Sequence, residues 1–218
     1  MTMRSRAMSW RTLATALTAS GFAMLGSCAS QPGMINRPGP AILAAARQGN
    51  PIAEYQVGLA AIQHAHSARE RANGLAWIRH AADQNLTMAQ DYMGEAYLQG
   101  HGVPQNTVVA LKWLHRAAER GGPAAQLQLG NLYESGDIVR VDDARAYFWF
   151  AVAAKPVRSD VTIYNIAQVR AIAEKDLSRV SAGLTPAQRE SIMQRVAAWQ
   201  PKPSAPFNGN VQLNARGA

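Results

Sequence analysis

An internal repeat with a period of 36 residues constrains the fold of this chain more than any other feature of its sequence. Alanines, glycines, tryptophans and pairs of adjacent alanines each recur at this interval over three units. Columns in register over three units do not arise by chance, so we expect an array in which each unit packs on its neighbours. The recurring positions are Ala53, Ala89 and Ala125; Gly58, Gly94 and Gly130; Trp77, Trp113 and Trp149; and the pairs Ala81–Ala82, Ala117–Ala118 and Ala153–Ala154, which Ala45–Ala46 precedes.

Each unit is predicted to be a pair of helices, and the middle unit shows the pattern best. Its first helix covers about 89–98, and Pro104 in the following loop prevents that helix from continuing. Asn106 is the expected N-cap of a second helix over 107–120. The Gly-Gly-Pro sequence at 121–123 then closes the unit, because glycine is favoured just past a helix end and proline stops the next turn.

The recurring glycines and tryptophans need a structural reason. Glycine inside a helix costs up to about 1 kcal/mol relative to alanine. We therefore expect a neighbouring helix, or the recurring tryptophan, to approach Gly94 and its equivalents closely. The tryptophans are interpreted as core residues, since a buried one hides roughly 150–250 Å² and a short array needs that contribution. A ligand-binding role for them is the weaker alternative.

The middle unit resembles the Sel-1-like repeat, a 36-residue relative of the tetratricopeptide repeat. The resemblance covers about residues 41–155 and implies an all-α fold, an α/α solenoid of about three helical hairpins. It also implies a scaffold that holds other proteins together, because stacked hairpins leave a long groove beside the core. The motif positions are Ala89, Met93, Gly94, Tyr97, Gly100, Gly102, Val103, Ala110, Trp113, Ala117, Ala118 and Gly121.

The outer two units depart from this motif in their loops. The third replaces the Gly-Val loop by the sequence at 137–141, and the first has His64 and His66 where the loop glycines would stand. With His101 in the second loop, a weak metal site is conceivable, but solvated loop histidines are the preferred interpretation. The sequence Arg-Glu-Arg at 69–71 is predicted to be a solvated loop.

Residues 156–200 continue as helix without the motif and are predicted to cap the last repeat. Thr185-Pro186-Ala187-Gln188 forms a capping box with proline at the first helical position. An apolar face is expected to follow, and residues 201–218, rich in Pro, Asn and Gly, are predicted to be a disordered tail. The face consists of Ile192, Met193, Val196 and Trp199.

The N-terminus has the order of a secretory signal over residues 1–27: a basic segment, a short uncharged apolar core and small residues. Leu25-Gly26-Ser27-Cys28 resembles the bacterial lipobox, which implies cleavage before Cys28 and lipid attachment to it. Residues 28–40 would then be a flexible tether. Ala29 after the cysteine resembles the outer-membrane default, so we expect a lipid anchor in the outer membrane, facing the periplasm. Ordinary cleavage, giving a soluble periplasmic or secreted protein, is the alternative.

Composition excludes several kinds of chemistry. Cys28 is the only cysteine, so neither an intramolecular disulfide nor a cysteine-based zinc site can form. No phosphate loop or nucleophile elbow is present, and we expect no cofactor and no catalytic or metal site. The net charge is +8, and three arginines before Cys28 leave +5 for the rest. At an envelope address this charge favours anionic glycans or lipid headgroups over nucleic acid.

Three functional hypotheses remain, and variable columns of the first helices are the predicted contact surface of the scaffold. The preferred one is a non-catalytic, lipid-anchored adaptor that binds one or more proteins. The first alternative is a cell-wall or polysaccharide-binding protein, in the extreme a weak cell-wall hydrolase. The second is a surface or secreted factor that binds a host protein. The predicted partner-binding residues are Tyr55, Gln56, Leu59, Asp91, Tyr92, Glu95, Leu127, Gln128 and Asn131; solvent exposure without binding is the other interpretation of these columns.

Overall fold

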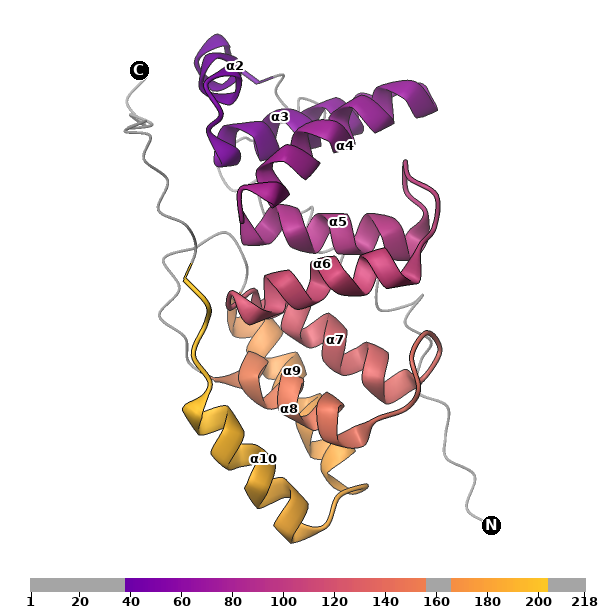
Figure 1. Ribbon diagram of the computed structural model, residues 1–218, viewed down its shortest axis with the longest axis vertical. Coiled ribbons are helices and arrows are strands. Elements are labelled where there is room, and N and C mark those ends of the chain that lie inside the picture. The colour runs from indigo at the N-terminus through magenta and orange to yellow at the C-terminus, as the bar shows by residue number, and fades with distance from the viewer. Residues whose placement is uncertain (1–37, 156–165, 204–218) are drawn as a thin grey trace. The chain divides into compact units, whose positions relative to one another are not determined.

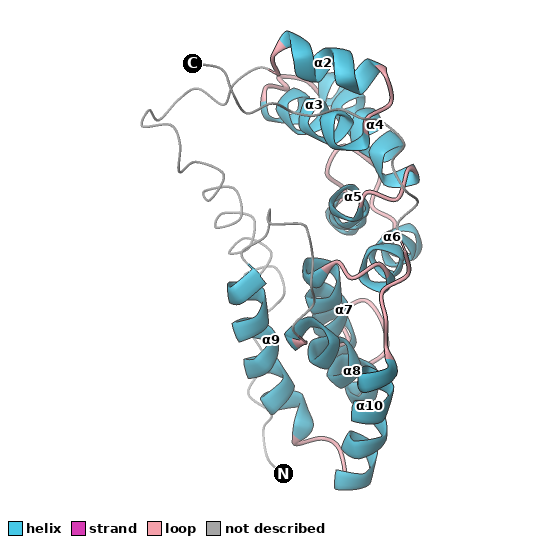
Figure 2. Cartoon of the chain, turned by 90° about the vertical axis from the view of Figure 1, so that its left-hand side faces the viewer, coloured by secondary structure: helices cyan, strands magenta, loops and turns pink. Residues whose placement is uncertain are grey.

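The computed structural model describes residues 38–155 and 166–203, and all regular secondary structure within these ranges is helical (Figures 1 and 2). The predicted signal peptide, Cys28 and nearly all of the tether lie outside the described residues. The described residues divide into two compact units. Residues 38–122 and 201–203 form the N-terminal unit, and residues 123–155 and 166–200 form the C-terminal unit.

The N-terminal unit contains a leading helix and two helical hairpins, in agreement with the repeat register. Each helix packs against the next one along the chain (Figure 1). The hairpins are therefore the first two repeats, and the leading helix is the half unit that carries Ala45 and Ala46. The helices are α2 (Pro40–Arg47), α3 (Pro51–Gln63), α4 (Ala68–Asp83), α5 (Thr87–Gln99) and α6 (Thr107–Glu119).

Local signals in the sequence fix the ends of these helices. The side chain of Asn106 accepts a hydrogen bond from the backbone N–H of Val109, which confirms it as the N-cap of α6. Asn50 caps α3 in the same way. Gly100 and Gly121 follow α5 and α6 with φ of 72° and 85°, a left-handed conformation that only glycine adopts without strain.

The first hairpin has a shorter loop than the second, and one expectation about it was wrong. Residues 69–71 are exposed but helical, because Ser67 accepts a hydrogen bond from the N–H of Glu70 and starts α4 at Ala68. Without the two loop glycines of the second repeat, nothing breaks the helix at these positions. The solvated Arg-Glu-Arg segment is thus the first turn of α4.

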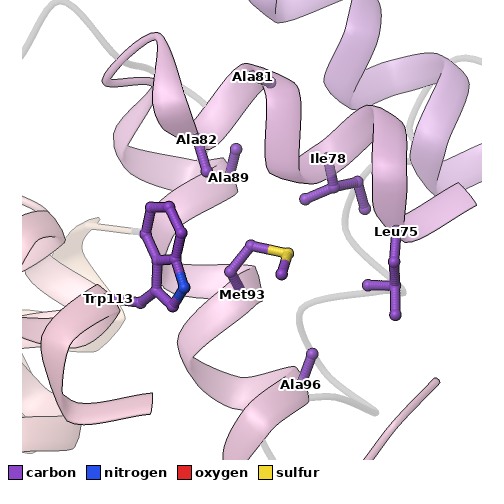
Figure 3. Packing of buried hydrophobic residues seen from close by; sticks show 8 residues of the cluster. All are labelled: Leu75, Ile78, Ala81, Ala82, Ala89, Met93, Ala96 and Trp113. Carbon is purple, nitrogen blue, oxygen red and sulfur yellow. The ribbon is translucent and has the colours of Figure 1, made fainter. Parts of the chain in front are cut away.

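The core of the N-terminal unit lies where α4, α5 and α6 meet (Figure 3). Its alanines are at most 2 % exposed, so the helix backbones approach each other closely around the side chains of Met93 and Trp113. Trp113 is 8 % exposed and Trp149, in the C-terminal unit, is 7 % exposed, which confirms both as core residues. The prediction that Trp77 is a core residue needs correction, because its side chain is only half-buried. The cluster consists of Leu75, Ile78, Ala81, Ala82, Ala89, Met93, Ala96 and Trp113.

The C-terminal unit contains the third hairpin and the predicted cap. Helix α8 (Asp143–Ala154) packs against α7 (Pro123–Ser135), α9 (Ile166–Ser181) and α10 (Pro186–Ala198). The capping box at the start of α10 is confirmed, since Thr185 and Gln188 exchange hydrogen bonds between side chain and backbone. At the other end of α10, the ammonium group of Lys155 donates to three carbonyl oxygens, those of Val196, Ala197 and Trp199.

Two predictions about the C-terminal residues need correction. Ile192 and Val196 are each 4 % exposed, but Met193 is 44 % exposed and Trp199 only half-buried, so the apolar face of α10 is narrower than expected. Residues 201–203 were predicted to begin a disordered tail. In the structure, the backbone N–H of Lys202 donates to the carbonyl of Glu119 at 2.8 Å, and its ammonium group lies 2.5 Å from the Glu119 carboxylate.

Candidate functional site

The N-terminal unit brings four of the predicted binding residues together on α3 and α5. The rings of Tyr55 and Tyr92 meet edge to face, with 6.4 Å between their centroids and 79° between their planes. Glu95 lies close enough to both tyrosines and to Asp91 to raise their pKa values, and Asp91 does the same to Tyr55. We call these four residues the tyrosine–acid cluster. All four are half-buried, and the two tyrosines pack against the alanine-rich core described above.

The acids of the cluster are held in an environment that disfavours their charge. Burial, together with the neighbouring carboxylate of Glu95, raises the pKa of Asp91 to about 8. Burial also raises the pKa of Glu95, against a hydrogen bond at 2.9 Å from the side chain of Gln99. One oxygen of Asp91, Oδ1, is buried and has no hydrogen-bond partner. A buried acceptor without a partner costs folding free energy, which makes this carboxyl group a candidate functional group.

The pKa values of the two tyrosines are raised as well. Burial and the charge of Glu95 raise the pKa of Tyr92 to about 12, and Arg71 on α4 opposes this effect. Burial, followed by the negative charge of Asp91, raises the pKa of Tyr55. Both phenols therefore stay protonated at physiological pH. The cluster presents aromatic rings, hydroxyl groups and two carboxyl groups, which suit recognition of a cation or a hydrogen-bond donor.

The remaining predicted residues fall into three environments. Gln56 is exposed, and Leu59 is half-buried against the core of the N-terminal unit. In the C-terminal unit, Gln128 and Asn131 are half-buried, and Oε1 of Gln128 is buried without a partner. Leu127 is only 1 % exposed, so its assignment to a contact surface was wrong. Leu127 was assigned to the surface because its column varies in polarity between repeats. An apolar leucine side chain is nevertheless favoured in the core, where it is removed from water.

The sequence analysis missed a buried polar column at the same 36-residue interval. Glu54, Gln90 and Gln126 are each at most 1 % exposed. The carboxylate of Glu54 accepts a hydrogen bond from Gln84 at 2.8 Å and lies 2.7 Å from Nδ1 of His80. The side chain of Gln90 donates to the carbonyl of Ala82 at 2.9 Å. The repeat register itself was the signal, since Glu, Gln and Gln recur one residue after the alanine column.

Glu54 and His80 also line a shallow pocket between α2, α3 and α4. Its other walls are mostly apolar and include the half-buried Trp77. The carboxylate of Glu54 already has two partners, His80 and Gln84, within the protein. The remaining lining residues are Ala46, Arg47, Gly49 and Ala76.

The loop histidines do not gather into a metal site in the described part of the chain. There, no group of three or more His, Cys, Asp or Glu side chains is placed to hold a metal ion. The backbone N–H of His66 instead donates to the carboxylate of Glu70 at 2.7 Å. Within the same residues, none of the helices has both the length and the apolar character needed to cross a bilayer.

Comparison with known proteins relates these helical hairpins to one repeat family. The Sel1 repeat family matches residues 87–122 and 123–155, which are the second and third hairpins. No curated protein matches the chain.

Two solved structures are similar to the chain. The first is c5321, a protective antigen present in uropathogenic Escherichia coli strains and displaying an SLR fold. It has a TM-score of 0.56 and 29 % identity over 78 % of this chain, and the match spans only 37 % of its own length. A Sel1 repeat protein from Oxalobacter formigenes has a TM-score of 0.50 and 31 % identity over 58 % of this chain and 96 % of its own. These similarities confirm the predicted α/α solenoid class.

Proposed function

The chain belongs to the Sel1 repeat family, and we propose that it is a non-catalytic scaffold of the bacterial envelope that binds proteins through the face carrying the tyrosine–acid cluster. Proteins of this family are helical-repeat scaffolds for protein–protein interaction. In the N-terminal unit, Gln56 and Leu59 join the cluster as proposed binding residues. Gln128 and Asn131 are proposed binding residues of the C-terminal unit, taken by itself.

The unpartnered carboxyl group of Asp91 is the observation that carries this proposal. A buried acid beside a second acid lowers the stability of the fold at neutral pH, and perturbed groups of this kind gather at functional sites. The neighbouring tyrosines have the residue type that is enriched where proteins bind each other. A merely solvated face would have no need of a buried carboxyl group.

The proposed address depends on the N-terminal sequence. We propose that the signal over 1–27 is removed, that Cys28 carries the lipid, and that the anchor lies in the outer membrane, facing the periplasm. The lipobox resemblance and the Pro/Gly-rich tether support this arrangement. Several acyl chains on one residue hold a protein at a membrane far more firmly than a single chain does.

The test is a crosslinking pull-down of the protein expressed in its own host, with Cys28→Ala in parallel. We expect the wild-type protein to enrich a small set of envelope proteins, and Cys28→Ala to lose the membrane-attached ones. A triple variant, Tyr55→Ala/Tyr92→Ala/Asp91→Asn, should lose the same proteins while it stays helical by circular dichroism. Enrichment of cell-wall polysaccharide in place of proteins would contradict the scaffold proposal and favour the glycan-binding alternative.

A surface-exposed or secreted factor is a second candidate, which the similarity to a protective antigen favours. Protease treatment of intact cells separates this candidate from a periplasmic scaffold. Cleavage in intact cells would support the surface location, whereas protection until the outer membrane is permeabilised would support the periplasmic one. A cytoplasmic protein of the same cells serves as the control for lysis.

A further inference from the structure

The cation that would balance the tyrosine–acid cluster is missing from the described residues. No Lys, Arg or His lies within 4.0 Å of either carboxylate there, whereas three of the unit's four other acids, Glu54, Asp83 and Glu119, each have such a neighbour. The fourth, Glu70, is exposed and accepts a hydrogen bond from the backbone N–H of His66. Glu95 receives one hydrogen bond, from Gln99, and Oδ1 of Asp91 receives none. Two neighbouring carboxyl groups are therefore left with only a neutral amide donor.

The rings beside these carboxyl groups suit a positively charged side chain. A guanidinium or ammonium group is attracted to the face of an aromatic ring within about 6 Å, and to carboxylates through charge-assisted hydrogen bonds. Elsewhere in this protein, arginines already pack on aromatic rings in this way: Arg116 lies 5.0 Å from the ring of Trp113, and Arg195 lies 4.9 Å from that of Phe148. Arg71 lies near Tyr92 but is not within ion-pair distance of either acid.

We propose that the tyrosine–acid cluster is a receptor for one basic side chain, an arginine or lysine on an exposed segment of the partner protein. The cation is held by Asp91 and Glu95 against the rings of Tyr55 and Tyr92. This inference rests on the proposed function and specifies the chemistry of the partner. It also assigns the destabilising buried acid a role, because the partner's charge supplies the interaction that the isolated protein lacks.

Proton release accompanies this binding. In the free protein the carboxyl group of Asp91 titrates near pH 8, under the influence of burial and Glu95. The other ionisable groups facing the cluster are Tyr55 from α3, Arg71 from α4 and Tyr92 from α5, and burial keeps both phenols protonated at this pH. A bound cation favours the ionised carboxylate, so binding should strengthen as the pH rises from 6.5 to 8.5.

The probe is N-acetyl-arginine amide, titrated into the protein purified from its host and followed by the NMR signals of the tyrosine rings. N-acetyl-citrulline amide, which has the same length and a neutral head group, is the matched control ligand. We expect the arginine compound to shift the signals of Tyr55 and Tyr92 in a saturable way, and the citrulline compound to bind at least about fivefold more weakly. Equal binding of the two compounds would overturn the proposal.

Two isosteric variants test the acids separately. Asp91→Asn and Glu95→Gln should each weaken binding of the arginine compound at least about fivefold. Asp83→Asn, which neutralises a carboxylate with a 57 % exposed side chain on α4, should leave it unchanged. The increase in affinity between pH 6.5 and 8.5 should be present in the wild type and lost in Asp91→Asn. A wild-type affinity that is the same at both pH values, or is kept in both variants, would show that these acids do not bind the cation.

This experiment is separable from the pull-down that tests the proposed function. If the wild-type protein enriches envelope partners that the double variant Asp91→Asn/Glu95→Gln retains, the scaffold proposal stands and the basic side-chain receptor is wrong. If no protein partner is enriched, the scaffold proposal fails, and the titration with the arginine compound still decides whether the cluster binds a cation.

Discussion

The side chain of Leu114 occupies the space beside Gly94, with its Cδ2 2.6 Å from the position that a Cβ on that glycine would take. The first repeat has the same relationship between Ile78 and Gly58, at 2.5 Å. In the third repeat, the ring of Phe150 fills the corresponding space beside Gly130. The second helix of each repeat thus approaches the recurring glycine closely, as expected. The side chain in contact with the glycine is not the tryptophan but the residue directly after it in the sequence.

Gly94→Ala should therefore destabilise the protein, although alanine is the better helix former. The gain in helix propensity is about 1 kcal/mol, whereas forcing a methyl group into the Leu114 side chain costs typically 1–3 kcal/mol. We expect a net loss of about 1 kcal/mol in urea unfolding followed by circular dichroism. Gly94→Ala/Leu114→Ala, in which the clash is absent, shows whether the steric contact is the cause. Higher stability of the single variant would contradict this packing.

Trp113→Ala should be far more damaging, because the indole is 8 % exposed in the core cluster. Truncation of a buried tryptophan costs typically 3–5 kcal/mol, through lost burial and the cavity that remains. Trp113→Phe keeps part of the volume and should lose less. The measurement is again urea unfolding followed by circular dichroism. A Trp113→Ala variant as stable and as helical as the wild type would contradict the assignment of Trp113 to the core.

Features of this fold that depend on local sequence could be predicted. The repeat register, the Asn106 cap, the capping box at Thr185 and the closing Gly121 involve residues within a few positions of each other or at a fixed interval. Local hydrogen-bonding groups and the φ requirements of glycine determine these features, so no knowledge of tertiary packing is needed.

The burial and contacts of individual side chains, which depend on which face of a helix packs against a neighbouring helix, were predicted less well. Leu127 and Asp91 occupy the same column, but Leu127 is fully buried whereas Asp91 is half-buried in the tyrosine–acid cluster. The edge-to-face contact of Tyr55 with Tyr92 joins residues 37 positions apart, one more than the repeat period, so no column aligns them. Tertiary packing, not helix periodicity, determines these contacts.

Asp91→Asn should stabilise the protein at neutral pH. The folded state raises the pKa of this carboxyl group to about 8, so the native protein binds the proton more tightly than the unfolded chain does. Its contribution to stability is therefore largest below about pH 4 and is lost progressively as the pH rises to about 8. The asparagine variant lacks this loss and should be more stable by roughly 2–5 kcal/mol at pH 7.5, where about 5 kcal/mol corresponds to the full shift in pKa.

The difference between the Asp91→Asn variant and the wild type should nearly vanish at pH 4, where the aspartic acid is protonated in the folded state. Urea unfolding of both proteins at pH 4, 6 and 7.5 gives the difference, because titration of the groups that do not interact with Asp91 is common to the two. Asp83→Asn, which removes an exposed carboxylate at the end of α4, is the control for loss of a carboxylate outside the cluster. An Asp91→Asn variant less stable than the wild type at pH 7.5 would contradict the raised pKa.

Arg179→Met should destabilise the C-terminal unit in a way that also depends on pH. The guanidinium group of Arg179 on α9 donates to both oxygens of Glu134 on α7, each at 2.5 Å, and lies 3.0 Å from the buried Asp176. Without it, two carboxylates face each other with no cation between them. Since the arginine side chain is 46 % exposed, we expect a loss of only about 1–2 kcal/mol at pH 7.

The loss from Arg179→Met should become smaller as the pH falls. Burial already raises the pKa of Asp176 against the opposing effect of Arg179, and removal of the arginine raises it further, so the variant takes up this proton more readily than the wild type. Unfolding in urea at pH 7 and pH 4 measures the change. The second variant, Arg179→Met/Glu134→Gln, removes the repulsion and should recover part of the stability at pH 7. An equal loss at both pH values would indicate that Arg179 acts through packing of its aliphatic stem and not through its charge.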